Sequence, residues 1–197
     1  MMASTLMSTL DCAGRRRLLQ AGLAAGVGIL VSPHAFATSQ DDSPTVRPKP
    51  GDLVIRADDP EHRPLRPEDI PLNARQLAAW AMDPANRTVR NGSRFNALIL
   101  LRLDEAALTA TTRARAANGV LAYTAICTHE GCDVEGWIAD RFVLSCACHE
   151  SEFDPKDAAR VLSGPAPRVL PALPLKIVDG ALVVARPFTS RVGFEQG

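Results

Sequence analysis

Two short loops carry the residues best suited to chemistry. The first reads Cys127-Thr128-His129-Glu130-Gly131-Cys132, and the second reads Cys146-Ala147-Cys148-His149-Glu150-Ser151. A Cys-x-His pair followed by a Cys-x-x-His pair supplies two thiolates and two imidazoles. Such a set can hold a tetrahedral zinc ion, or a pair of irons in which cysteines bind one iron and histidines bind the other. Both alternatives predict a metal centre between the two loops.

These loops resemble the cluster-binding motifs of Rieske proteins, C-T-H-x-G-C and C-P-C-H-G-S, both in their internal spacing and in their separation. The resemblance extends over about residues 97–186. It implies one Rieske-type 2Fe-2S cluster per chain. Cys127 and Cys146 would bind the buried iron. His129 and His149 would bind the outer iron, near solvent.

The other two loop cysteines are expected to pair with each other. The resemblance implies a disulfide between Cys132 and Cys148 that ties the loops together, and such a bond fits an oxidising compartment. A zinc site would leave both cysteines without a role, and zinc does not require export of a folded protein. We therefore favour the iron cluster. The fifth cysteine, Cys12, lies in the N-terminal segment and needs no partner.

Residues at the end of the second motif and just after it are predicted to tune the cluster. Ser151 matches a serine that, in the family, donates a hydrogen bond to a cluster sulfide. Phe153 stands where high-potential members have a tyrosine that donates to a cysteine sulfur. A hydrogen bond to a charged acceptor contributes about 1.5–3 kcal/mol, which is roughly 60–130 mV for one electron. We therefore predict a potential below that of the tyrosine-containing members. Glu150 replaces a glycine, a residue suited to positive φ.

The first 37 residues are predicted to be an export signal. A basic stretch that includes Arg15-Arg16-Arg17 precedes an apolar run, and Ala35-Phe36-Ala37 is a small-x-small cleavage pattern. The stretch resembles a twin-arginine signal, which exports proteins already folded, often with their cofactor, and so predicts a periplasmic location. The apolar run Leu18–Val31 is shorter than the roughly 20 residues of a spanning helix, which favours cleavage after Ala37. An uncleaved segment that anchors the protein in the plasma membrane, facing the periplasm, is the alternative.

The rest of the chain predicts a polar linker at residues 38–52 and a Rieske domain at residues 53–190. Short runs rich in Val, Ile and Leu predict strands at Leu53–Arg56, Ala97–Leu103, Val120–Ile126, Phe142–Ser145, Leu173–Val178 and Ala181–Ala185. Asp179-Gly180 predicts a tight hairpin between the last two. Residues 104–118 predict the one helix, which begins with acidic residues and ends before Gly119. The expected fold is mainly β, a small antiparallel sandwich or barrel with a cluster-binding subdomain and one short inserted helix.

These features predict an electron-transfer component with no independent substrate site. The formal net charge of zero gives no reason to expect a nucleic-acid partner. An oxygenase would need a second iron held by two histidines and a carboxylate. Only His34 and His62 remain besides the cluster histidines, and cleavage after Ala37 would remove His34. The sequence therefore argues against an oxygenase.

The predicted partner is a redox protein, either a molybdenum oxidoreductase or cytochrome b and c subunits. Phe153 and Glu150 look like features of the small Rieske subunits of arsenite-oxidase-like periplasmic enzymes. We therefore predict a periplasmic subunit that passes electrons towards a cytochrome c. The alternative is the membrane-anchored Rieske subunit of a ubiquinol-cytochrome c reductase.

Overall fold

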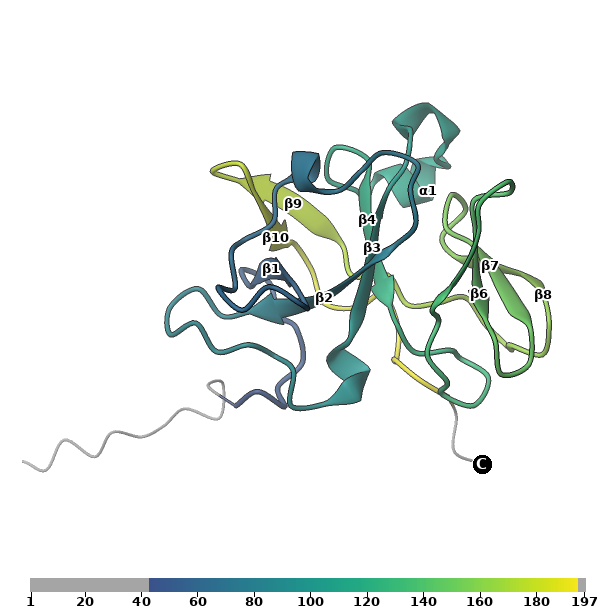
Figure 1. The fold of residues 1–197 in the computed structure, drawn as a ribbon, viewed down its shortest axis with the longest axis horizontal. Helices are drawn as coiled ribbons and strands as arrows, with labels where there is room; N and C mark the ends of the chain where they lie inside the picture. Colours follow the sequence, from purple (N-terminus) through teal and green to yellow (C-terminus); the bar gives the residue numbers. More distant parts are fainter. Residues whose placement is uncertain (1–42, 195–197) are drawn as a thin grey trace, which may run out of the picture. The chain divides into compact units, whose positions relative to one another are not determined.

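The structure, a computed structural model, describes residues 43–194. Two antiparallel sheets form the framework of this part of the chain (Figure 1). The larger sheet has the strand order β4 (Val120–Thr124), β3 (Leu98–Arg102), β2 (Leu77–Met82), β1 (Leu53–Arg56), β10 (Ala181–Val184) and β9 (Leu175–Val178). The smaller sheet has the order β5 (Gly136–Ile138), β6 (Val143–Cys146), β7 (Ser151–Asp154) and β8 (Arg160–Ser163). The mainly antiparallel β fold predicted from the sequence is confirmed.

The larger sheet curls so that its two ends approach each other. The segment just before β9 runs along β4, where Thr124 N donates to Pro171 O and Leu173 N donates to Ala122 O, at 3.0 and 2.9 Å. Tyr123 and Ala172 form an antiparallel bridge at the same place. These bonds shape the sheet into a half-barrel.

Strand β3 is buried on both faces because it separates two hydrophobic cores. Leu98 and Leu100 face a core inside the larger sheet, whereas Ile99 and Leu101 face a second core that contains residues of the smaller sheet. Successive side chains of a strand point to opposite faces, so a continuous apolar run fits a strand with a core on each side. Strand β4 follows the same pattern. The two sheets therefore share a packed interface.

The six predicted strands all form, and their ends move by no more than two residues. The predicted hairpin also forms, with φ of 50° at Asp179 and 80° at Gly180. Strands β2, β5, β7 and β8 were not predicted from the sequence. Strand β7 pairs with β6, and β8 pairs with β7 at the edge of the sheet that carries the second loop.

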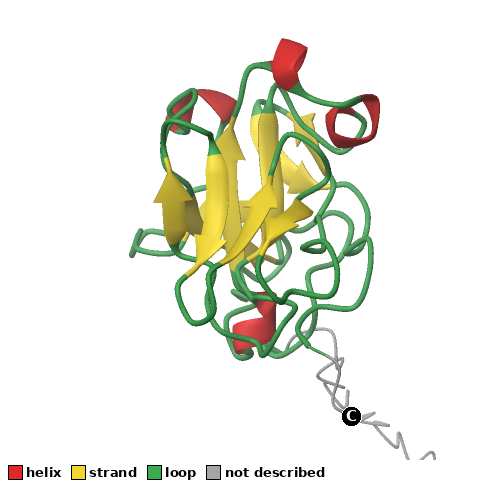
Figure 2. Cartoon of the chain, turned by 90° about the vertical axis from the view of Figure 1, so that its right-hand side faces the viewer, coloured by secondary structure: helices red, strands yellow, loops and turns green. Residues whose placement is uncertain are grey.

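The predicted helix at residues 104–118 is wrong in length. The structure has a 3-10 turn at Glu105–Ala107 and a single helical turn, α1, at Ala110–Arg113. Figure 2 shows that the helical pieces lie only in connections between strands. Buried Leu108 adopts an extended backbone between the two pieces, and the Thr109 hydroxyl caps α1 by accepting from Thr112 N. Burial of Leu108 thus interrupts the helix that composition favoured. Two further 3-10 turns are Pro67–Asp69 and Arg94–Asn96.

Residues 43–50, predicted to belong to the linker, lie against the domain. Asn96 donates through Nδ2 to Val46 O at 2.8 Å, and Gly92 N donates to Pro44 O at 3.0 Å. Nearby, the wholly buried Arg90 forms ion pairs with Asp52 at 3.3 Å and with Asp83 at 2.8 Å. The N-terminal part of the described chain is thereby tied to the larger sheet.

The predicted signal peptide, its alternative as a retained anchor and the start of the linker fall on residues 1–42, outside the described residues. Within residues 43–194, no helix has the length and apolar character needed to cross a bilayer.

Candidate metal centre

The two predicted loops lie next to each other and are joined by a covalent bond. The first follows β4, and its turn is closed by Cys127 N donating to Cys132 O at 2.8 Å. The second connects β6 to β7, which begins at Ser151 opposite Cys146. A disulfide links Cys132 to Cys148, with their Cα atoms 6.5 Å apart. The disulfide predicted from the resemblance is therefore present.

The other two cysteines are free and almost fully buried. Cys127 and Cys146 are 1% and 2% exposed, in the core shared by the two sheets. Burial raises the pKa of the Cys127 thiol to about 11, and the adjacent Cys146 thiol adds to this rise. Metal binding requires the thiolate, and a bound cation supplies the charge that stabilises it in this apolar setting. The pair of thiols thus fits the buried side of a metal centre.

The two histidines lie on the outer side of the loops. Their Nδ1 atoms are 3.1 Å apart, and their rings are nearly perpendicular, at 86°. A tetrahedral ion bound to two imidazole nitrogens at about 2.1 Å each would hold those nitrogens roughly 3.4 Å apart. The observed separation of His129 and His149 is close to that value. The side chain of His149 is 47% exposed, so this side of the site meets solvent.

A third loop, residues 163–168, covers the site and touches both of the others. Ala166 N donates to Ser151 Oγ at 3.2 Å, and the Thr128 hydroxyl donates to Arg168 O at 2.6 Å. Gly164 packs so tightly that an added Cβ would lie 2.5 Å from the Cα of Ser151. Because Ser151 Oγ accepts from Ala166, its own proton is free to point towards the site. The Ser151 side chain also contacts the Cys127 thiol and lowers its pKa, against the larger effect of burial.

Two departures from the family pattern now have structural descriptions. Glu150 has φ of 56°, a conformation that a glycine would adopt at less cost. Phe153 is completely buried between its cross-strand partners Leu144 and Val161. It lies in the same core as the two free cysteines and has no group that can donate a hydrogen bond.

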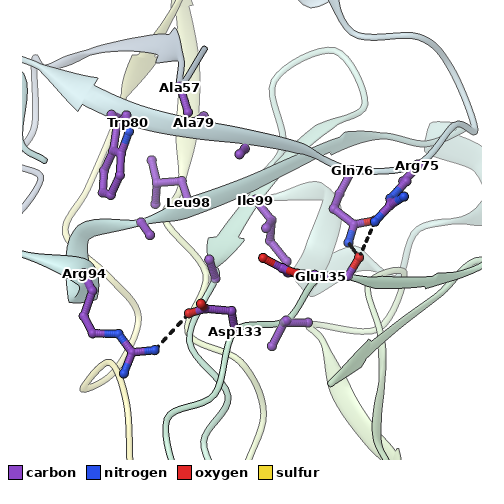
Figure 3. Close-up of a pocket in the computed structure, with 14 residues that line it drawn as sticks. Ala57, Arg75, Gln76, Ala79, Trp80, Arg94, Leu98, Ile99, Asp133 and Glu135 are labelled. Atoms are coloured by element: carbon purple, nitrogen blue, oxygen red, sulfur yellow. Dashed lines mark hydrogen bonds and ion pairs between the residues drawn. The ribbon is translucent and has the colours of Figure 1, made fainter. Parts of the chain in front are cut away.

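One residue that positions the first loop was missed in the sequence. Arg94 donates to Gly131 O at 2.7 Å and pairs with Asp133 at 2.9 Å (Figure 3). Arg94 and Asp133 flank a cavity of about 580 Å³, where Gln76 donates through Nε2 to Glu135 O. A lone arginine far along the chain from its partners gives no sequence signal for this role.

Comparison with known proteins supports the same interpretation of the loops. Residues 80–174 match the family model described as Rieske [2Fe-2S] domain. Over 146 residues the chain is 31% identical to the cytochrome bc1 complex Rieske iron-sulfur subunit of Streptomyces lividans, covering 73% of this chain and 85% of that protein. The chain belongs to the Rieske [2Fe-2S] protein family. It is therefore a Rieske electron-transfer protein with a Rieske-type 2Fe-2S cluster.

Other relatives share a smaller part of their length with this Rieske protein. The bc1 Rieske subunit of Streptomyces coelicolor is 31% identical over 146 residues, which are 73% of this chain and 41% of that subunit. A putative respiratory nitrate reductase Rieske subunit of Haloferax mediterranei is 41% identical over 76 residues, 38% of this chain and 34% of that subunit. This chain thus spans less than half of each of these two relatives.

Solved structures also match this chain. One is a plasma membrane Rieske protein of Synechocystis PCC 6803, with a TM-score of 0.35 and 23% identity over 55% of this chain and 84% of that one. The soluble domain of Rieske protein II from Sulfolobus acidocaldarius has a TM-score of 0.37 and 16% identity over 72% of each chain.

Proposed function

We propose that the two buried thiols, Cys127 and Cys146, bind one iron of the cluster and that the imidazoles of half-buried His129 and exposed His149 bind the other. The pairing of the thiols in the core and the short distance between the imidazole nitrogens support this assignment. When bound, the cluster accepts and releases one electron at a time. The exposed imidazole edges would be the route by which electrons enter and leave.

The ligand assignment is tested by iron content and electron paramagnetic resonance of the reduced protein. We expect two irons per chain and the low average g value of mixed cysteine and histidine ligation. His149→Ala should lose this signal, whereas the control His62→Ala should keep it, because His62 lies in the Pro-rich segment far from the loops in sequence. A colourless protein containing zinc, or a Rieske signal that survives His129→Ala combined with His149→Ala, refutes the assignment.

We further propose that the chain is a periplasmic electron-transfer subunit of a redox complex, passing electrons towards a cytochrome c. The supporting observation is the polar rim around the histidines. A cavity of about 540 Å³ beside His149 has a mixed lining in which Glu150, Glu152 and Ser163 are polar and Ile138 is apolar, and the Glu130 carboxylate lies 3.8 Å from His149. Small apolar ligands bind in mostly apolar pockets, so this rim suits a protein partner better than a quinol. Phe153, which cannot supply the hydrogen bond of high-potential members, is consistent with this function.

A second function, the membrane-anchored Rieske subunit of a ubiquinol-cytochrome c reductase, is favoured by the two Streptomyces relatives, which are both bc1 Rieske subunits. The Streptomyces lividans bc1 subunit aligns over most of its own length. The disulfide between the loops is compatible with both functions. We therefore keep this second function as the alternative that the experiments must separate.

Fractionation and partner assays distinguish the two functions. For a periplasmic subunit, the native full-length protein should be released with the periplasm, and a short-chain ubiquinol should fail to reduce it. The reduced protein should in turn pass its electron to cytochrome c. Membrane association that resists carbonate, together with rapid reduction by the ubiquinol, would instead establish the alternative.

A further inference from the structure

We propose that Glu130 lowers the reduction potential of the cluster by holding a carboxylate beside the outer edge of His149. This role rests on the ligand assignment proposed above. Glu130 is a positioning residue in this proposal, because its charge acts on the metal centre through the imidazole and not by direct ligation.

The geometry of the two histidines places Glu130 on the side of the ring opposite the metal. The two Nδ1 atoms face each other, so the Nε2 atom of His149 lies on the side of its ring that is turned away from His129. Glu130 Oε2 is 3.8 Å from this Nε2. The distance is too long for a hydrogen bond, so the interaction is one of charge. Carboxylates recur beside the outer nitrogen of metal-bound histidines, where they raise the basicity of the ring.

Glu130 and His149 come from different loops, and the structure fixes the backbone of Glu130 closely. The next residue, Gly131, donates its N–H to Cys127 O at 3.1 Å and accepts from Arg94 at 2.7 Å. Gly131 has φ of 76°, and a Cβ there would lie 2.7 Å from the ring of Phe194. The first loop is therefore held from behind, while the side chain of Glu130 remains 63% exposed. The fixed backbone therefore keeps the exposed Glu130 carboxylate within reach of His149.

The sign of the effect follows from the charge of the electron. Reduction adds negative charge to the centre, so a nearby carboxylate disfavours the reduced form and lowers the potential. In a water-like medium, two unit charges about 4 Å apart change an equilibrium by roughly fivefold. Because the carboxylate is exposed and the cluster lies beyond the ring, farther than about 4 Å away, we expect a twofold to fivefold change in the reduction equilibrium, and fivefold corresponds to about 40 mV.

The test compares full-length, cluster-loaded variants by protein-film voltammetry at one fixed pH. Glu130→Gln keeps the shape of the side chain and removes its charge, so the potential should rise by the amount given above. Glu130→Asp keeps the charge and should stay closer to the wild type. Glu135→Gln is the matched control. It makes the same change in net charge as Glu130→Gln, but at a residue whose backbone oxygen accepts from Arg75 and Gln76 and not at the residue beside His149.

Two further measurements separate charge from structure. The electron paramagnetic resonance signal and iron content should be the same in all variants, which shows that ligation is intact. The difference between wild type and Glu130→Gln should shrink at about 1 M salt, where exposed charges are screened within roughly 3 Å.

An unchanged potential in Glu130→Gln, or an equal rise in Glu135→Gln, overturns the proposal while leaving the proposed function intact. An equal rise in Glu130→Asp overturns it too, because that variant retains the charge. If the wild-type protein instead shows no Rieske signal, it is the ligand assignment that fails.

Discussion

Gly164 offers the sharpest test of how the third loop holds the cluster site. A Cβ at this position would lie 2.5 Å from Ser151 Cα, 2.7 Å from Ser151 N and 2.8 Å from Glu150 O. All three are backbone atoms of the second loop, so no side chain can rotate away. Gly164→Ala must therefore push the third loop from the second, and the hydrogen bond from Ala166 N to Ser151 Oγ would lengthen or break.

The cost of this substitution has two parts, which a matched variant separates. An alanine at positive φ costs roughly 1–2 kcal/mol. Losing the hydrogen bond and leaving a buried N–H without an acceptor adds about 1–3 kcal/mol. Gly51 also has positive φ, 97° against 84° at Gly164, but a Cβ there meets no atom within 4 Å. Gly51→Ala should therefore show only the first part, and Gly164→Ala should destabilise by about 2–5 kcal/mol in total.

The assay follows urea unfolding by circular dichroism and cluster release by visible absorbance. The two signals are recorded separately because a bound cofactor can break two-state unfolding. We expect Gly164→Ala to release its cluster faster than both the wild type and Gly51→Ala. The reasoning is refuted if both alanine variants are destabilised equally and release the cluster at the wild-type rate.

Three other perturbations follow from the same structure. Phe153→Tyr should raise the potential by up to roughly 60–130 mV if the new hydroxyl donates to a cysteine sulfur, and voltammetry showing no rise would contradict this. Replacing both Cys132 and Cys148 by Ser removes a bond across a sequence separation of 16, and should lower the free energy of unfolding by about 3 kcal/mol in urea titrations. Hydrogen bonding from Ala85 N, with support from the nearby cations Lys49 and Arg90, lowers the pKa of Asp83 below its ordinary 3.8. The stability that Asp83 contributes is therefore complete at neutral pH and is lost as the pH falls from about 3.8 through the lowered pKa. The difference in unfolding free energy between wild type and Asp83→Asn should vanish over that range, and a difference independent of pH would refute the argument.

The cluster loops were predictable because each is a contiguous motif. Their spacing indicated the residues that we propose as ligands, and the resemblance that they carry implied the disulfide, which is present. The strands β3 and β4 were equally visible, because burial on both faces requires an unbroken run of apolar residues. Where local sequence and tertiary environment agree, prediction from sequence works.

Strand β2 and the long helix show where such prediction fails. Leu77–Met82 contains three alanines, which have little intrinsic preference for strands, and it becomes a strand because β1 and β3 pair with it on both sides. Residues 104–118 have helical composition, yet burial of Leu108 extends the chain there. Contacts between distant segments, such as Arg94 with Gly131, carry no local signal at all.

The arrangement also separates two ways of setting the potential. Phe153 lies with the two thiols in the core beneath the cluster site. Neighbouring core side chains must shift to make room for any atom added there. Glu130 lies on the exposed side with the imidazoles, where a change of charge disturbs no core contact. Effects at sites without shared contacts usually add. The shift in potential of Phe153→Tyr combined with Glu130→Gln should therefore equal the sum of the two single shifts. A clear departure from that sum would mean that the core and the exposed loops respond as one unit.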